Sequence, residues 1–241
     1  MCILKLILEF QRKKINNMST NNIIYQEIAN NASASEKRIR LEELEEQIWE
    51  SSVCTLLYLM NFPKAILEYD VRKFDSQDPN MCYRLSILLS TDRVPELEYR
   101  ISRSPQYAVE YAEQRLKLVS WADIGMPDVL DIIGSDPEWA LRYTKNCLKK
   151  KSYKSLGRDD IEEKILGIPD LAVEYSYHIL DKNYRDYGRA DIEEKIFTEN
   201  KATFNYCYLV LGRRAPKDVE DRFLEGGYYG YLYKKYLMPK E

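Results

Sequence analysis

The stretch GRDDIEEKI at residues 157–165 returns as GRADIEEKI at residues 188–196, changed at one position and lying 31 residues further along the chain. Self-similarity of this kind indicates a repeat architecture. At an offset of 32 residues the match extends upstream through columns of identical residues: Pro105, Pro137 and Pro169; Ala108, Ala140 and Ala172; Tyr111, Tyr143 and Tyr175; Leu116, Leu148 and Leu180. The unit that follows continues the last three columns with one residue deleted, at Thr203, Tyr206 and Leu211. Four copies are clear.

Each repeat has the periodicity of a helical hairpin. Ile161 and Ile165 are spaced i, i+4, which places them on one stripe of a short helix. The second half of a repeat begins with a proline after a capping residue, as in Asp136-Pro137, and this suits the first turn of a helix. We expect a helix A of about two turns followed by a helix B of about three. Three residues of helix A are expected to face water: Glu162, Glu163 and Lys164.

The side chains of helix B predict how the hairpins stack. Small side chains allow helices of neighbouring repeats to approach closely, and the tyrosine column is expected to fill the gap between hairpins. One hairpin cannot bury its apolar stripe alone, so neighbours must stack. The predicted fold is all-α, an α-solenoid of about six stacked helical hairpins with a period near 32 residues. Two columns hold the small residues: Ala108, Ala140, Ala172 and Thr203; and Ala112, Thr144, Ser176 and Cys207.

Degenerate segments flank the clear repeats. Residues 36–60 carry a helical apolar stripe longer than any repeat helix, which we interpret as an N-terminal capping helix after a partly flexible extension, residues 1–35. A coiled-coil seam in the capping helix would span too few heptads. Repeats are expected over residues 61–225 and a degenerate C-terminal cap over 226–241, because the terminal units of a stack are atypical. Residues 36–241 are therefore predicted to form a single helical-repeat domain.

The composition fits a protein of a reducing cytoplasm. A chain of 241 residues with 45% hydrophobic residues can bury a substantial core, and only 9 glycines and 9 prolines argue against disorder. No apolar run approaches the length of a membrane span, and the first residues lack the pattern of a signal peptide. The 5 cysteines are odd in number and mostly lie at predicted core positions, so they do not predict a disulfide framework. We expect a cytoplasmic location.

The sequence does not predict an enzyme. The one histidine, His178, lies at a variable position of helix B, where a surface role is far more common than a catalytic one. Phosphate-binding glycine loops and the GxSxG, HExxH and CxxC motifs are absent from the sequence. The carboxylates of DDIEE recur at the repeat period, which indicates the solvated face of a repeated helix. No catalytic residue, cofactor or metal ligand is therefore assigned.

Charge follows the repeat and is not in large excess. The net charge of −3 gives no global reason to bind nucleic acid. Basic residues follow each helix B, and acidic residues open each helix A. The favoured interpretation is that these charges complement helix dipoles. The other interpretation is a basic edge that tracks a phosphate backbone or meets an acidic protein.

A partner must contact residues that vary between repeats, because the residues of the core columns are expected to be buried between stacked hairpins. The most divergent stretch is the loop KKKSYKSLGR at residues 149–158, and DKNYRDYGR at residues 181–189 repeats its mixture of cations and aromatic rings. Tyrosine and arginine are frequent anchors of interfaces. The alternative is that both loops are only solvated. Seven residues are predicted to bind a partner: Lys150, Tyr153, Lys154, Arg158, Arg185, Tyr187 and Arg189.

The order of residues in one repeat resembles that of a known type of helical repeat. The order Arg-x-Pro-Glu-Leu-Glu-x-x-Ile, then Ser/Asp-Pro-x-x-Ala-x-x-Tyr-Ala, reads RVPELEYRISRSPQYAVEYA at residues 93–112. It is similar to helical repeats in proteins of unknown function from large tailed bacteriophages and giant viruses, over about residues 63–236. The later units depart from it, with Asn200 in place of proline and Gly230 in place of alanine.

The resemblance implies a viral origin and no known active site. It thereby implies a viral accessory protein that binds or inhibits a host component, such as a host-defence protein. From the residues themselves we predict a non-catalytic protein with a macromolecular partner, most simply another protein. The alternative is a nucleic-acid-binding protein that uses the basic solenoid edge.

Overall fold

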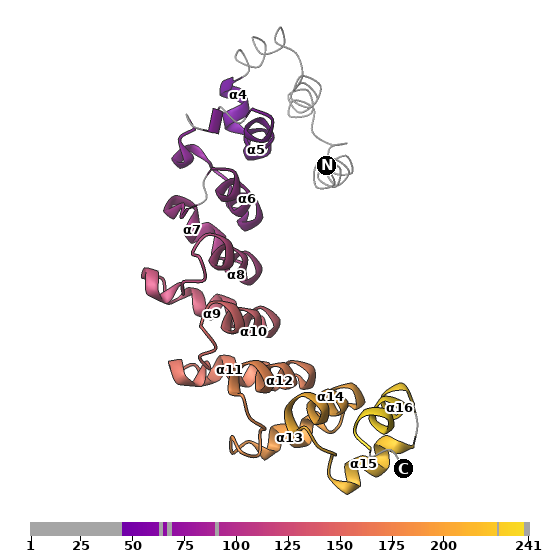
Figure 1. Cartoon of the computed structure of the whole chain (residues 1–241). Helices are drawn as coiled ribbons and strands as arrows, with labels where there is room; N and C mark the ends of the chain where they lie inside the picture. The colour runs from indigo at the N-terminus through magenta and orange to yellow at the C-terminus, as the bar shows by residue number, and fades with distance from the viewer. Residues whose placement is uncertain (1–44, 63–64, 67–68, 90–91, 226, 239–241) are drawn as a thin grey trace. The chain divides into compact units, whose positions relative to one another are not determined.

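The computed structural model (Figure 1) describes residues 45–62, 65–66, 69–89, 92–225 and 227–238 of the 241-residue chain. Within these ranges the regular structure is helical and no β-strand occurs, so the prediction of an all-α protein is confirmed. The chain divides into two compact units, Met1–Ile101 and Ser102–Glu241.

The described helices of the first unit are α4 (Glu45–Glu50), α5 (Ser52–Asn61), the 3₁₀ turn η3 (Val71–Lys73), α6 (Pro79–Leu89) and α7 (Pro95–Ile101). Ser51 separates the first two, because its hydroxyl accepts a hydrogen bond from the amide of Cys54 at 3.5 Å and so caps a new helix. The predicted single helix over residues 36–60 is therefore wrong in its described part. Its beginning and the predicted extension 1–35 lie outside the described residues.

The second unit consists of helical hairpins joined by loops that carry the 3₁₀ turns η4 (Ala122–Ile124) and η5 (Lys154–Leu156). Two of its helices end in π-helical turns, η6 (Ser176–Leu180) after α12 and η7 (Tyr206–Leu211) after α14. Its α-helices are α8 (Pro105–Gln114), α9 (Val129–Ile133), α10 (Pro137–Asn146), α11 (Asp159–Leu166), α12 (Pro169–Tyr175), α13 (Ala190–Ile196), α14 (Asn200–Asn205), α15 (Lys217–Leu224) and α16 (Gly227–Tyr236).

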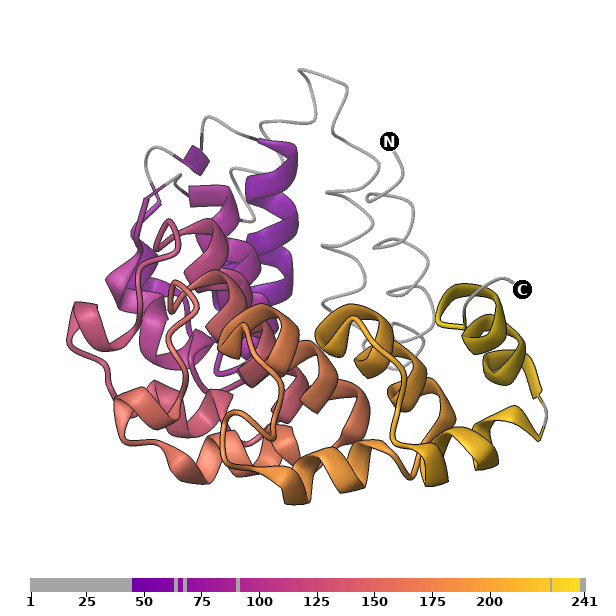
Figure 2. The same cartoon turned by 60° about the horizontal axis from the view of Figure 1, so that its bottom comes forward.

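The helices of the second unit alternate between a short helix A and a longer helix B. Helices α9, α11, α13 and α15 are the A helices, and α8, α10, α12, α14 and α16 are the B helices. Each B helix contacts the next B helix in the chain, from α8 through to α16, so the B helices lie side by side (Figure 2). Asp136 caps α10 as predicted, since its carboxylate accepts hydrogen bonds from the amides of Glu138 and Trp139 at 3.0 and 3.3 Å.

The columns read from the sequence are the core of the second unit. The column tyrosines Tyr111, Tyr143, Tyr175, Tyr206 and Tyr233 are all fully buried, as predicted for the four that precede α16. Both small columns are buried along their length from α8 to η7. In α16 the small column becomes Gly230, where an added Cβ would lie 2.6 Å from the carbonyl oxygen of Phe223. Close approach of helix A therefore requires glycine at this point.

The hydroxyls of four column tyrosines each accept a hydrogen bond from a buried backbone amide in the loop that precedes their own hairpin. Tyr143 Oη accepts from the amide of Trp121 at 2.9 Å, and Tyr175 Oη accepts from that of Tyr153 at 3.1 Å. Tyr206 and Tyr233 accept in the same way from Tyr184 and Ala215, at 2.8 and 2.7 Å. The loop amide, which no helix or strand could satisfy, is thus paired by a side chain.

The aromatic side chain at the same loop position bonds back to the preceding hairpin. Trp121 Nε1 donates to the carbonyl oxygen of Ala108 at 3.0 Å, and Tyr153 Oη donates to that of Ala140 at 3.1 Å. Tyr184 Oη donates to the carbonyl oxygen of Ala172 at 2.5 Å in the next loop. Each acceptor belongs to the small column of the previous B helix. One loop residue therefore links two neighbouring hairpins.

The change of period from 32 to 31 residues lies at the end of helix B. After α8 and α10, two successive residues adopt left-handed backbone, Lys117 with Leu118 and Lys149 with Lys150. After η6 a single left-handed residue, Asp181, suffices, and Gly212 takes this place after η7. After either ending, the following loop donates the same kind of hydrogen bond, from Tyr153 to Tyr175 and from Tyr184 to Tyr206. The single-residue ending reaches this position with one residue fewer.

Replacing Tyr143 with phenylalanine should lower the free energy of unfolding by about 1–3 kcal/mol, because the buried amide of Trp121 loses its acceptor. Chemical denaturation measures the change. Tyr177→Phe is the matched control, since its ring is 48% exposed and its loss of a hydroxyl should cost less than about 0.5 kcal/mol. Equal stabilities for Tyr143→Phe and the unchanged protein would contradict a structural role for this hydroxyl.

Candidate partner-binding surface

The seven residues predicted to bind a partner lie in two successive loops of the second unit, before α11 and before α13. The structure brings the two loops together at Tyr187, whose ring has the ammonium groups of Lys154 and Lys182 at 5.4 and 5.0 Å from its centroid. A cation over an aromatic ring is attracted by the negative electrostatic potential of the ring face. Lys182, which lies in the second loop but was not among the seven, therefore belongs to the same surface.

Tyr153 does not lie on this surface. Its side chain is fully buried, and its hydroxyl donates to the carbonyl oxygen of Ala140. Burial raises the pKa of this phenol well above its ordinary value. The expectation that Tyr153 is exposed to a partner is therefore wrong. The signal that could have found this is the aromatic column formed by Trp121, Tyr153 and Tyr184, which recurs at the repeat period.

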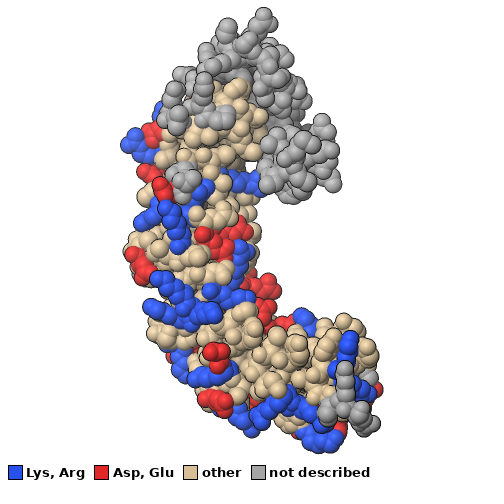
Figure 3. All heavy atoms as spheres, in the orientation of Figure 1, with Lys and Arg blue, Asp and Glu red and all other residues tan. Residues whose placement is uncertain are grey.

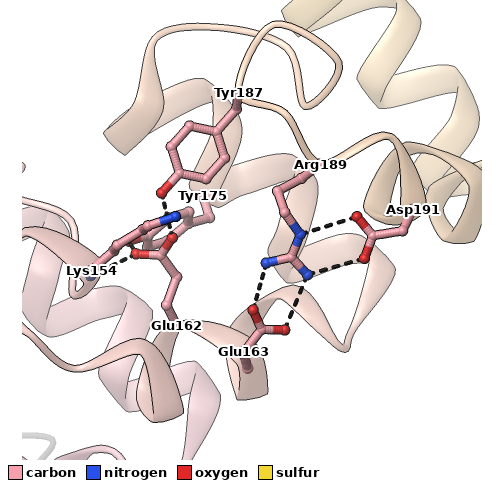
Figure 4. A network of polar contacts seen from close by, with 7 residues as sticks. All are labelled: Lys154, Glu162, Glu163, Tyr175, Tyr187, Arg189 and Asp191. Carbon is pink, nitrogen blue, oxygen red and sulfur yellow. Dashed lines mark hydrogen bonds and ion pairs between the residues drawn. The ribbon is translucent and has the colours of Figure 1, made fainter.

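A buried carboxylate organises the first of the two loops (Figure 4). Glu162 is only 3% exposed, although it was expected to face water. Its Oε2 accepts from Tyr175 Oη at 2.7 Å and from the amide of Lys154 at 2.8 Å, and its Oε1 accepts from Tyr187 Oη at 2.7 Å. Three donors compensate for the loss of hydration, which explains how a carboxylate can be buried here.

The buried carboxylate recurs at the same position of helix A. Glu193 and Glu220 are buried in α13 and α15, so the interpretation of the repeated DIEE carboxylates as a wholly solvated face is wrong. Arg185 binds Glu193 with a shortest distance of 2.7 Å, and Arg214 forms a two-bond pair with Glu220. In α9 the position is Leu130, and there the column tyrosine, Tyr143, donates to Ser120 Oγ at 3.2 Å.

Tyr187 is half-buried against this carboxylate. Burial raises the pKa of its phenol, and the hydrogen bond to Glu162 raises it further because the carboxylate disfavours a phenolate. Its hydroxyl is therefore held as a donor to Glu162, and the ammonium groups of two exposed lysines lie beside its ring.

The arginines of the predicted site are paired within the chain. Arg158 contacts Asp131 at 2.5 Å and Asp160 at 3.0 Å. Arg189 likewise bridges Glu163 and Asp191, at 2.5 and 3.0 Å (Figure 4). In each case the first carboxylate belongs to the preceding hairpin. Hydrogen bonds to these carboxylates raise the pKa of both guanidinium groups. The arginines therefore tie successive A helices together.

The lysines differ from the arginines. Among the described residues, no carboxylate forms an ion pair with any of the five exposed lysines of the two loops. We call these residues the lysine surface: Lys149, Lys150, Lys151, Lys154 and Lys182. Figure 3 shows one face of the second unit, where Lys and Arg side chains stand among carboxylates.

The backbone aims part of the lysine surface into solvent. Lys149 and Lys150 have φ of 52° and 63°, in the left-handed region that costs a non-glycine residue of order 1 kcal/mol. The same turn follows α8, so its geometry belongs to the repeat and not to the lysines alone. Its effect is to place consecutive cations on the outside of the turn.

His178 is half-buried beside Tyr177, with ring centroids 4.8 Å apart. Burial lowers its pKa first, and the positive charges of Lys145 and Lys150 lower it further. No group of three His, Cys, Asp or Glu residues in the described part of the chain could hold a metal ion.

Comparison with known proteins found no protein-family model, curated protein or solved structure that matches this chain. Searching the described helices for one long and apolar enough to cross a membrane finds none.

Replacing Glu162 with leucine, the residue of the same position in α9, should lower the free energy of unfolding by about 1–3 kcal/mol. The reason is that Tyr175 Oη and the amide of Lys154 would be buried without their acceptor. Glu194→Leu is the control, because Glu194 lies on the exposed side of α13. Thermal and urea denaturation compare the two; equal losses would show that the buried carboxylate is not structural.

Proposed function

We propose that this chain is a non-catalytic helical-repeat protein whose function is to bind another macromolecule, and that the partner is a protein with an acidic surface. The observation that carries the proposal is the difference between the loop arginines and the loop lysines. The arginines Arg158, Arg185 and Arg189 have carboxylate partners within the chain. The lysine surface has none among the described residues, so its charge remains available to a partner.

Helix-dipole complementation alone does not account for this difference. The favourable effect of a helix dipole on a cation falls off within the last turn of the helix, and α10 ends at Asn146. Lys149, Lys150 and Lys151 are three consecutive exposed cations after a single helix, and Lys154 and Lys182 add two more across the loop pair. Electrostatic complementarity of this kind speeds association and selects partners of opposite charge.

The architecture supports the same class of function. The hairpins of the second unit recur with a fixed core, and we propose that they belong to an α-solenoid of about six hairpins over residues 61–225. Solenoids present an extended surface in place of a closed pocket, and the surface residues are free to vary while the columns are kept. The contact residues we propose are the lysine surface and Tyr187, while Arg158, Arg185 and Arg189, also among the seven predicted residues, hold the two loops in place through their carboxylate partners.

We further propose that the protein is a viral accessory factor that acts in the cytoplasm of a host cell by binding or inhibiting a host component. This part rests on the resemblance of residues 93–112 to repeats of large bacteriophages and giant viruses. Nucleic acid is the second candidate partner, because cations without carboxylate partners are also what phosphate contacts require. The net charge of −3 does not favour it.

The test replaces Lys149, Lys150 and Lys151 together with serine. The control for net charge replaces Lys195, Lys201 and Lys217 with serine; all three are exposed elsewhere in the second unit, and Lys201 and Lys217 pair with Asp170 and Asp221. Both proteins are used to capture partners from host lysate with and without nuclease. We expect a nuclease-resistant protein partner that the first variant loses by at least about tenfold and the control retains.

Two results would contradict the proposal. Equal capture by both triple variants would place the binding surface elsewhere. Capture that nuclease abolishes, together with filter binding of DNA or RNA that weakens steeply as salt increases, would assign the lysine surface to nucleic acid.

A further inference from the structure

Successive B helices of the second unit meet through a fixed pair of stripes. The residue two positions before the column tyrosine faces the following B helix: the ring of Phe204 in α14 lies 6.4 Å from that of Tyr229 in α16. Two positions after the column tyrosine, Tyr208 faces Tyr236 with ring centroids 6.0 Å apart. The residues of the first kind are buried in four consecutive B helices: Val109, Leu141, Val173 and Phe204.

The corresponding stripe of α16 is uncovered. Tyr231 occupies the position of the four buried residues and is 60% exposed. Tyr228 and Lys235, at i−3 and i+4 from it, continue the stripe along the helix, and Tyr228 is 70% exposed. No helix in the described part of the chain packs over these side chains. Within the described residues, a surface that is buried in the four preceding B helices is therefore exposed in α16.

The chemistry of this stripe is complementary to itself. It offers aromatic rings at one end and an ammonium group at the other, and α16 contains no aspartate or glutamate. The ammonium of Lys235 already lies 5.0 Å from the centroid of the neighbouring Tyr236, which shows that lysine and tyrosine on this helix associate. Exposed tyrosines concentrated in this way are typical of an interaction surface.

We propose that the stripe formed by Tyr228, Tyr231 and Lys235 binds the same stripe of a second copy of this chain about a two-fold axis. In an antiparallel pair of α16 helices, with Tyr231 near the axis, Lys235 of each copy lies opposite Tyr228 of the other. Two cation–π contacts then flank a central tyrosine pair. The contact is isologous and closes after two copies.

A second copy fits this surface better than an open-ended chain of copies. A head-to-tail contact would need a second, different surface that matches this stripe, whereas a two-fold contact uses the same stripe of both copies. The stripe consists of three side chains of one helix, whereas a stable interface buries roughly 800 Å² per partner and involves many more residues. The dimer should therefore be weak and dependent on concentration.

Sedimentation velocity on the full chain over a range of micromolar concentrations tests the proposal. We expect a monomer–dimer equilibrium that Tyr231→Ser and Lys235→Glu each weaken by at least about tenfold. Tyr177→Ser is the control, because Tyr177 is exposed but lies on an internal hairpin, and it should leave the equilibrium unchanged. Circular dichroism checks that all variants remain folded.

A rescue experiment separates a contact at this stripe from a general effect on the surface. The double substitution Tyr228→Lys with Lys235→Glu should restore association lost in Lys235→Glu, since an ion pair replaces each cation–π contact. A protein that stays monomeric at every concentration would overturn the proposal. So would a dimer that none of these substitutions weakens, or a monomer whose stripe binds single-stranded oligonucleotides, which would assign the tyrosines to base stacking.

Discussion

The hydrogen bond from a loop amide to the hydroxyl of the column tyrosine is the contact on which the second unit depends. A chain that leaves helix B must cross to the next helix A, and its buried amide groups on the way have no partner in a helix ladder. Tyr143, Tyr175 and Tyr206 supply an acceptor to three of these crossings, while Tyr233 supplies a fourth. The aromatic residue at the crossing then bonds to the previous hairpin. Stacking and loop geometry are thus set by one recurring pair of side chains.

The hydroxyl is itself a donor, and the chain satisfies it in different ways. Ser120 accepts from Tyr143, whereas the buried carboxylates Glu162 and Glu193 accept from Tyr175 and Tyr206. Where a carboxylate is buried, hydrogen-bond donors surround it: the amide of Lys154 and the hydroxyls of Tyr175 and Tyr187 bind Glu162, and the guanidinium of Arg185 binds Glu193. The loops that carry the proposed partner-binding surface are therefore held in place by buried hydrogen bonds. Their arginines pair with carboxylates within the chain, and among the described residues their lysines do not.

The sequence predicts the core of this protein well and its loops poorly. Columns at a fixed offset identify buried residues directly, because a position that stays small or aromatic in every repeat must meet the same neighbour each time. Tyr153 was misplaced because its loop was judged by composition, although Trp121 and Tyr184 occupy the same column. Glu162 was misplaced because a carboxylate between two isoleucines has the pattern of a solvated face, and its three donors lie as far as 25 residues away. The break between α4 and α5 at Ser51 depends on a single helix cap, which the helical periodicity of the sequence does not reveal.

The central claim is that loop amides at the aromatic column are as well protected as helical amides. Native-state hydrogen exchange of the full chain measures this residue by residue. The account predicts that the amides of Trp121, Tyr153 and Tyr184 exchange as slowly as amides in the middle of α10. The amide of Ser155, bonded only within its own exposed turn, should exchange much faster. Exchange of the three aromatic amides at the rate of Ser155 would contradict the account.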